Sequence, residues 1–266
     1  MTVAELRRAL AQLPACEADY ILRETVGGDF RFVAEVSAAA AESTLRAAVR
    51  RAAGEPLQYI FERAYFMDLV LHVDPRVLIP RPETELLAEF AAANAPRCGS
   101  MLDLCTGSGA VALAVKYLRP DLSVAASDLS SAALEVAGIN RSACSLEVEL
   151  LEGDLFAPVS GRRFDFISAN PPYVSAAELA CCPAEVRDFE PRLALVADGN
   201  GLAVVRRIAE NAAEHLNPGG WVAVEIGETQ QLEAGDFFRA DNRFSGVRVM
   251  NDLCGRPRLV VARREK

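Results

Sequence analysis

Two short segments carry residue types that could bind and orient a small molecule. The first is Asp103-Leu104-Cys105-Thr106-Gly107-Ser108-Gly109, a glycine-containing turn between an apolar run and a helix-like run. Glycines in such a turn let the backbone approach a ligand closely, and residues 107–112 fit the G-x-G-x-x-A pattern of adenosine-containing cofactors. About twenty residues further on, Asp128 could accept hydrogen bonds from both ribose hydroxyls. The pattern alone does not separate NAD from S-adenosylmethionine, and a tight turn that binds nothing is the alternative.

The second segment, Asn170-Pro171-Pro172-Tyr173, decides between these cofactors. It directly follows another apolar run, which places it at the same edge of a parallel sheet as the glycine turn. Because proline has no N–H, the Asn170 side-chain oxygen and the Pro171 carbonyl can both accept hydrogen bonds from one planar NH₂ group. Tyr173 can stack on that group. Two acceptors would hold a weakly nucleophilic nitrogen facing a methyl sulfonium, so the two segments together predict N-methylation from S-adenosylmethionine.

The elements that must position these segments alternate between short apolar runs and amphipathic helices. We expect strands at residues 101–104, 123–127, 146–151, 164–169, 221–226, 247–250 and 259–262. Helices are expected at residues 83–93, 110–118, 132–140 and 202–216. Repeated βα units predict a doubly wound α/β fold with a mostly parallel sheet, of the Rossmann-like class, which binds ligands beyond the carboxyl ends of its strands.

The first sixty or so residues predict three short amphipathic helices in a small bundle. Thr2 and Glu5 have the spacing of a capping box at the first helix. From Tyr65 the apolar residues alternate, and Asp74-Pro75-Arg76 is expected to turn the chain into residues 77–79, which predicts a β-hairpin. The expected organisation is a helical docking domain at 1–62, a β-hairpin linker at 63–82 and a methyltransferase domain at 83–266.

Composition excludes several classes of protein. The chain has 28 Lys and Arg against 37 Asp and Glu, a net charge of −9, which argues against direct binding to nucleic acid phosphates. Seven Cys without a C-x-x-C pair, and a start without signal-peptide character, predict reduced thiols in a cytoplasmic protein. No apolar run is long enough for a membrane span. His72 and His215 lack metal-ligand spacing, so we expect no metal.

The sequence resembles the protein-(glutamine-N5) methyltransferases that modify peptide chain release factors, the PrmC/HemK family. The resemblance extends over nearly the whole chain. Its most specific part is Val77-Leu78-Ile79-Pro80-Arg81-Pro82-Glu83-Thr84-Glu85, which other N-methyltransferases with an Asn-Pro-Pro-aromatic segment lack. Further similar segments are residues 56–60, 185–195, 225–227 with Gln230 or Gln231, and 252–256.

The resemblance implies a set of site residues. The methionine part of S-adenosylmethionine would be wrapped by Cys105, Thr106, Gly107, Ser108 and Gly109. Asp128 would hold the ribose, and Asp154 and Leu155 would flank the adenine. Asn170 would contact both the methionine moiety and the substrate, with Asn170 and Pro171 as the catalytic pair and Pro172 and Tyr173 completing a glutamine pocket. The glutamine would belong to the Gly-Gly-Gln loop of class 1 release factors, which the helical domain would help to dock, and S-adenosylhomocysteine would be the product.

Some positions depart from the family or stay open. Cys105 stands where the family more usually has Gly, and Phe61-Glu62-Arg63 replaces a Gly-containing turn. We expect Asp103 to hydrogen-bond the glycine turn rather than the cofactor. Glu83 and Glu85 are either first-turn acids of a helix or pocket residues, and the role of Glu190 is open.

Two other functions compete with this interpretation. An adenine-N6 methyltransferase would use the same geometry on a flipped base, but the charge of −9 disfavours it. A non-catalytic adenosine-binding protein is disfavoured by the intact Asn-Pro-Pro-Tyr segment.

Overall fold

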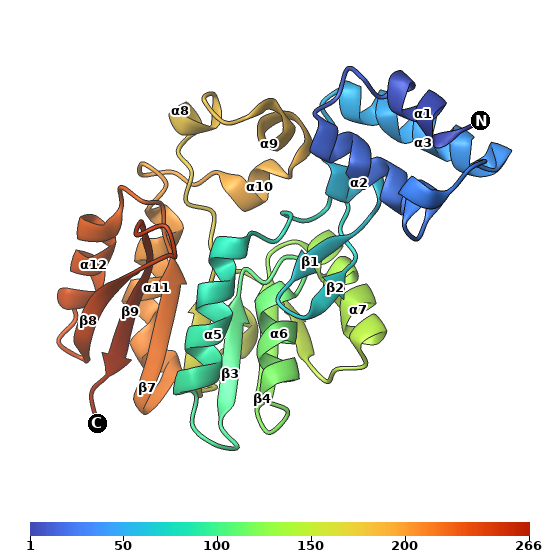
Figure 1. Ribbon diagram of the computed structural model, residues 1–266. Helices are drawn as coiled ribbons and strands as arrows, with labels where there is room; N and C mark the ends of the chain where they lie inside the picture. The colour runs from blue at the N-terminus through green and yellow to red at the C-terminus, as the bar shows by residue number, and fades with distance from the viewer. The chain divides into compact units, whose positions relative to one another are not determined.

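The computed structural model describes residues 1–266, which divide into two compact units (Figure 1). The smaller unit consists of Met1–Arg63 together with Pro183–Phe189, and the larger unit of Ala64–Cys182 together with Glu190–Lys266. The chain therefore leaves the larger unit once and returns to it. Residues 183–189 belong with the N-terminal helices, whereas the sequence-based limits placed them in a domain running without interruption from residue 83.

The smaller unit is helical. It contains α1 (Val3–Ala9), α2 (Ala15–Val26), η1 (Phe30–Phe32), α3 (Ala38–Ala52), α4 (Leu57–Ile60) and α9 (Ala184–Phe189). The Thr2 side chain and Glu5 form the predicted capping box of α1. The fully buried core side chains include Leu6, Leu10, Ile21 and Leu22. Their helical spacing places them on the buried faces of α1 and α2. On α3 the buried apolar residues are Ala41, Ala47 and Ala48, whereas its larger apolar side chains Leu45 and Val49 are exposed, contrary to the stripe that the spacing predicts.

One ion-pair cluster attaches α9 to this bundle. The guanidinium of Arg51 on α3 donates to Glu17 on α2 at 2.7 Å and to Glu185 on α9 at 2.8 Å. Arg51 is a fork-shaped donor and binds both carboxylates at once. The short helix α9 has no fully buried side chain of its own, so this charged contact is a principal attachment to the bundle.

The larger unit is built on a seven-stranded sheet. Its strands are β3 (Ser100–Leu104), β4 (Ser123–Asp128), β5 (Glu149–Glu152), β6 (Phe164–Ala169), β7 (Leu216–Glu225), β8 (Phe244–Asn251) and β9 (Pro257–Arg264). The order is β5-β4-β3-β6-β7-β9-β8; β5 to β7 in this order are parallel, and β9 is antiparallel to both neighbours. From β3 the chain runs outward through β4 to β5 and then crosses back to β6 on the other side of β3. This reversal of strand order creates a switch point between β3 and β6. The predicted mostly parallel, doubly wound sheet is confirmed.

Helices cover both faces of this sheet (Figure 1). One face packs against α5 (Glu85–Asn94), α6 (Ala110–Leu118) and α7 (Ser131–Cys144), and the other against α11 (Ala203–His215) and α12 (Gln231–Arg239). Successive side chains of β3 alternate between the two cores, with Met101 in one and Leu102 in the other. The shorter elements are η2 (Pro82–Thr84), η3 (Ala157–Val159), α8 (Ala176–Leu179) and α10 (Arg192–Leu195). None of the helices combines the length and the apolar character that a membrane crossing requires.

The β-hairpin is present, but its predicted turn is wrong. Strands β1 (Ala64–Phe66) and β2 (Leu69–Leu71) pair antiparallel, with Ala64 opposite Leu71. The turn therefore lies at Met67, whose φ is +49°, and Asp68. Residues 74–76 form a local turn in which Asp74 accepts from the Arg76 amide at 3.0 Å, but residues 77–79 form no strand. Alternating apolar residues predicted extended chain here and could not set the pairing register.

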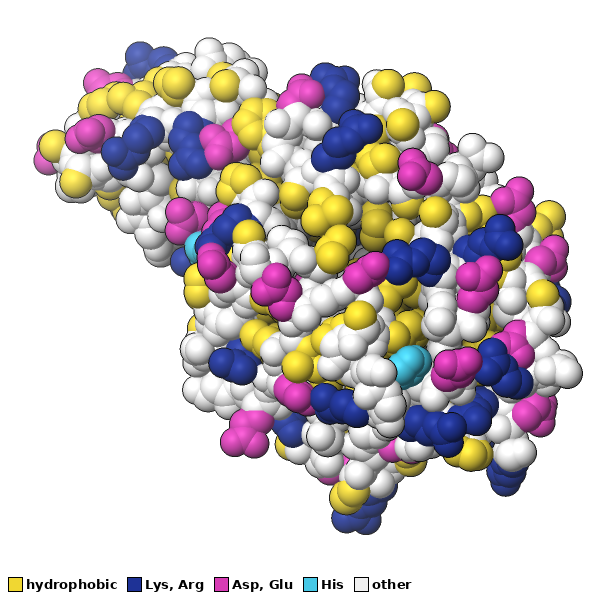
Figure 2. All heavy atoms as spheres, turned by 180° about the vertical axis from the view of Figure 1, so that it is seen from behind, with side chains coloured by type: hydrophobic (Ala, Val, Ile, Leu, Met, Phe, Trp, Pro, Cys, Tyr) yellow, Lys and Arg dark blue, Asp and Glu magenta, His cyan; other side chains and the backbone are white.

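Charged side chains of both signs are mixed over the surface. On the face in Figure 2, Lys and Arg side chains lie among Asp and Glu side chains without a continuous basic stripe. Several arginines pair with an acid two residues earlier in the chain, as Arg31 does with Asp29 and Arg243 with Asp241. Much of the positive charge is thus neutralised locally.

Candidate active site

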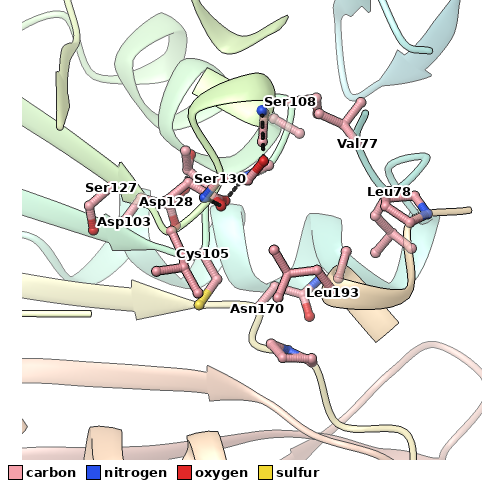
Figure 3. Close-up of a pocket in the computed structure, with 18 of the residues that line it drawn as sticks. Val77, Leu78, Asp103, Cys105, Ser108, Ser127, Asp128, Ser130, Asn170 and Leu193 are labelled. Atoms are coloured by element: carbon pink, nitrogen blue, oxygen red, sulfur yellow. Dashed lines mark hydrogen bonds between the residues drawn. The ribbon is translucent and has the colours of Figure 1, made fainter. Parts of the chain in front are cut away.

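A cavity of about 420 Å³ opens at the carboxyl edge of the sheet, beside the switch point (Figure 3). All the residues that line it belong to the larger unit. They include Asp103, Cys105 and Gly107 after β3, Asp128 at the end of β4, and Asn170 after β6. The two segments singled out in the sequence therefore line one cavity, because the strands before them are neighbours and parallel.

The glycine turn, residues 105–109, has a left-handed backbone at three of its positions. The φ angles are +56° at both Cys105 and Gly107 and +82° at Gly109. A Cβ added at Gly107 would meet no atom within 4 Å, whereas one at Gly109 would lie 3.2 Å from Leu113. Gly107 thus borders open space, and Gly109 permits close packing at the start of α6. Cys105 adopts a conformation that costs a non-glycine residue about 1–2 kcal/mol, and burial raises the pKa of its thiol.

Asp128 is held facing the cavity by two backbone amides. Its Oδ2 accepts from the Gly107 amide at 2.8 Å, and its Oδ1 accepts from the Ser130 amide at 2.9 Å (Figure 3). Burial raises the pKa of this carboxyl against these two hydrogen bonds. Each carboxylate oxygen keeps acceptor capacity beyond one hydrogen bond, so both can accept from a pair of neighbouring hydroxyls.

Asp103 fastens the glycine turn to the adjacent strand. It is 1% exposed, and its two oxygens accept from the Ser168 and Thr106 hydroxyls, each at 2.6 Å. Burial raises the pKa of this carboxyl to about 6, and the charge of Asp128 adds to the rise. Asp103 thus joins β3, the turn and β6, which agrees with the expectation that it hydrogen-bonds the turn.

Asp154 and Leu155 line the far side of the same cavity. The Asp154 carboxylate accepts from Arg207 of α11 at 2.7 Å, and both side chains are about half exposed. Leu155 is 8% exposed. Sequence reasoning missed Arg207, because its position on an amphipathic helix gives no local signal of this contact.

The four residues of the NPPY segment, residues 170–173, divide between cavity and core. Asn170 and Pro172 line the cavity, and Pro171 is buried outside its lining. The Tyr173 hydroxyl donates to Oε1 of Glu225 at 3.2 Å; Tyr173 is partly exposed and is not among the residues that line the cavity. The stacking of Tyr173 on a substrate group stays a prediction.

Comparison with known proteins identifies the family. The model of the methyltransferase small domain matches residues 82–184. The chain is 40% identical over 258 residues to the release factor glutamine methyltransferase of Gloeobacter violaceus, covering 94% of this chain and 90% of that one. It is 42% identical over 240 residues to the enzyme of the same name from Moorella thermoacetica, covering 89% and 84%. This chain belongs to the release factor glutamine methyltransferase family.

A solved structure supports the fold independently. The methyltransferase from Pyrococcus furiosus superposes with a TM-score of 0.57 at 20% identity, covering 75% of this chain and 90% of that one. The likeness shows the shared methyltransferase fold. The predicted fold class and the resemblance to this family are both confirmed.

Two of the three acidic residues that the sequence left open, Glu85 and Glu190, have structural partners. Neither Glu83 nor Glu85 lines the cavity; Glu85 accepts from the Met67 amide at 2.8 Å and so fixes the hairpin turn. Glu190, 6% exposed, pairs at 2.5 Å with Arg81, which does line the cavity.

The apolar walls were not predicted residue by residue. Val77, Leu78 and Leu193 lie around the mouth in Figure 3. Leu193 is 55% exposed there. An apolar wall beside a few convergent polar groups is typical of a small-molecule site.

Proposed function

We propose that this chain transfers the methyl group of S-adenosylmethionine to the side-chain amide nitrogen of the glutamine in the Gly-Gly-Gln loop of class 1 peptide chain release factors. The observation that carries the proposal is the single cavity shared by Asp128, the glycine turn and Asn170. Membership of the release factor glutamine methyltransferase family supports the choice of substrate.

The residues around the cavity fit S-adenosylmethionine. Residues 105–109 would wrap the methionine part, Asp128 would accept from the ribose hydroxyls, and Asp154 and Leu155 would flank the adenine. Three carboxyl groups and three arginines line the cavity, which suits a ligand that carries both positive groups and a carboxylate, as S-adenosylmethionine does. When bound, this cofactor supplies an electrophilic methyl group; the family fold and the donor set require no metal for that chemistry.

The NPPY segment would hold the nucleophile. Oδ1 of Asn170 and the carbonyl of Pro171 would each accept one N–H of the glutamine amide and aim its nitrogen at the methyl group. As the nitrogen attacks, positive charge develops on it, and the two acceptors favour that charge. The methyl–sulfur bond would break as the methyl–nitrogen bond forms, with S-adenosylhomocysteine as the leaving group, and the amide proton would pass to water, so no dedicated base is needed.

The partner would be a protein rather than a nucleic acid. The net charge of −9 disfavours binding to phosphates, and on the face in Figure 2 the Lys and Arg side chains lie among Asp and Glu side chains. The helical unit would provide part of the docking surface for the release factor.

Methyl transfer from labelled S-adenosylmethionine tests the proposal. The acceptors are an intact class 1 release factor, the same factor with its loop glutamine changed to alanine, and duplex and single-stranded DNA. Label on the intact factor alone, mapped to the glutamine side chain, is expected. Label on DNA but not on the factor would replace the proposed substrate with adenine, and label on none of them would reject the activity.

A further inference from the structure

We propose that Gln230 is a positioning residue that holds the carboxyl-terminal end of the NPPY segment and thereby aims the Pro171 carbonyl at the substrate amide. The inference rests on the proposed function and adds a residue that lies outside both the NPPY segment and the lining of the candidate active-site cavity. The observation behind it is a joint in which the Gln230 carboxamide binds the backbone of three separate segments.

Both ends of the Gln230 carboxamide are used. Its Oε1 accepts from the Gly227 amide at 2.9 Å. Its Nε2 donates to the carbonyl oxygens of Tyr173 at 2.9 Å and of Asn200 at 3.1 Å. A primary amide has one acceptor end and two donor protons, so this side chain matches its three partners and cannot flip without losing all of them.

The sheet places Gln230 next to the end of the NPPY segment. Ala169 of β6 is paired with Val224 of β7, so the turn that follows β7 emerges beside the segment that follows β6. Gln230 comes after that turn, as the N-cap residue of α12. It therefore reaches Tyr173 from a position 57 residues further along the chain.

The two prolines make the NPPY segment stiff. The pyrrolidine ring fixes φ at Pro171 and Pro172, and a residue that precedes a proline is restricted to extended conformations, which applies to Asn170 and Pro171. Little rotational freedom is therefore left between the end of β6 and Pro172. The direction of the Pro171 carbonyl is set by how the two ends of the segment are held, and the Tyr173 backbone is one of these ends.

Gly201 packs against the same carbonyl from another side. Its φ is +81°, and a Cβ added there would overlap the Tyr173 carbonyl oxygen and lie 2.8 Å from Nε2 of Gln230. Only glycine lets the turn at residues 199–201 approach this closely. The Asn200 carbonyl that Gln230 binds belongs to the same turn, so one hydrogen bond and one close contact together fix the position of the Tyr173 carbonyl.

Tight packing does not orient Gln230 on its far side. There the side chain borders a second cavity, of about 250 Å³, whose lining also includes Ser175, Asn200 and Thr229. Hydrogen bonds rather than apolar contacts therefore set the direction of the carboxamide. Removal of its donor end should free the Tyr173 carbonyl to move.

Gln230→Met tests the donor end. Methionine is similar in length and offers no N–H, so both carbonyls lose their partner. We expect kcat to fall roughly 30-fold, in the range of small misplacements of catalytic groups. The KM for the release factor, and the affinity for S-adenosylhomocysteine measured by calorimetry, should each change less than about threefold, because only the aim of the acceptor is altered. Gln231→Met is the matched control: the buried Oε1 of Gln231 has no hydrogen-bond partner, and its loss should leave kcat unchanged.

Gly201→Ala tests the same carbonyl from the other side. The added methyl group has to displace the Tyr173 carbonyl by about 1 Å to reach ordinary contact, so we expect kcat to fall roughly 100-fold. Gly199→Ala is its control, since φ there is +62° and an added Cβ would come no closer than 3.7 Å to another atom. Both alanines carry left-handed strain, but only the one at residue 201 meets Tyr173, so Gly199→Ala should keep kcat within about threefold of the parent chain.

The double variant Gln230→Met, Gly201→Ala shows whether both residues act on one atom. Its kcat should be little lower than that of Gly201→Ala alone, because the carbonyl is already displaced. Losses that multiply in the double variant, equal kcat in Gly201→Ala and Gly199→Ala, kcat of Gln230→Met within twofold of the parent, or an equal loss of S-adenosylhomocysteine affinity would each overturn the inference.

The comparison of Gln230→Met with Gln231→Met does not depend on the folding of Gly201→Ala. The parent chain assayed beside all variants separates these results from failure of the proposed function, which would show as no glutamine methylation by the parent itself.

Discussion

Replacing Glu225 with Gln should change how the stability of this protein depends on pH. Glu225 is 1% exposed at the end of β7, and burial raises the pKa of its carboxyl from 4.5 to about 7. Between these two values the folded state keeps a proton that the unfolded state has released. The contribution of Glu225 to the free energy of unfolding is therefore at its maximum below about pH 4.5 and is lost as the pH rises through about 7. Glutamine does not titrate, so the variant should lack this loss.

The magnitude follows from the two pKa values. Their difference corresponds to about 3 kcal/mol over the whole window, of which about 2.5 kcal/mol falls between about pH 5 and about pH 8. The free energy of unfolding of the parent chain should fall by that amount relative to Glu225→Gln across this range. Asp103, with a pKa of about 6, titrates in both proteins and cancels in the difference.

Urea unfolding at several pH values, followed by the fluorescence of Trp221, measures this difference. Trp221 is the only tryptophan and lies on β7, the strand that ends in Glu225. Glu233→Gln, a change at an exposed position on α12, serves as the control and should follow the parent chain at every pH. A difference between the parent and Glu225→Gln that stays constant from about pH 5 to pH 8 would refute the reasoning, because Glu225 would then titrate alike in the folded and unfolded states.

Three further outcomes are expected. Asn170→Ala should lower kcat by at least about 100-fold in the methyl-transfer assay while calorimetric affinity for S-adenosylhomocysteine changes little; near-full turnover would exclude the proposed role. Asp128→Ala should weaken S-adenosylhomocysteine binding by about 1–3 kcal/mol, since two buried hydroxyls lose a charged acceptor; unchanged affinity would contradict this. Arg51→Ala should release α9 from the bundle and raise amide hydrogen exchange at residues 184–189 roughly fivefold, or about 1 kcal/mol, with exchange in α11 as the internal reference; equal protection in both proteins would show that other contacts hold α9.

Local patterns determined most of the larger unit. The apolar runs and the helices between them predicted the strands from β3 to β9 and the helices α6, α7 and α11 within a few residues, because side-chain period reports directly on which face is buried. The site followed from the same reasoning. Parallel strands present their carboxyl ends at one edge, so a glycine turn after one strand and Asn170 after another were expected to meet, and they line one cavity.

Pairings between distant residues were decided only by the tertiary structure. Alternation near residue 65 predicted extended chain, but the Met67 turn and the register of Ala64 with Leu71 set the hairpin. Residues 183–189 join the helical unit through Arg51, a contact 134 residues apart in sequence between Arg51 and Glu185. Neither the register of the hairpin nor the attachment of residues 183–189 has a local periodic signal, because each depends on a partner that is distant until the chain folds.

The support behind Asn170 shows the same division. The sequence determined that Asn170 and two prolines end a strand, because these residue types and their order are local. The Asn170 carboxamide donates to Thr84, which lies 86 residues earlier in the chain. The pairing of β6 with β7 brings Glu225 to Tyr173 at the other end of the segment. The order of residue types along the chain determines which chemical groups lie at a strand end, whereas the orientation of each side chain is fixed by neighbours that only the folded sheet supplies.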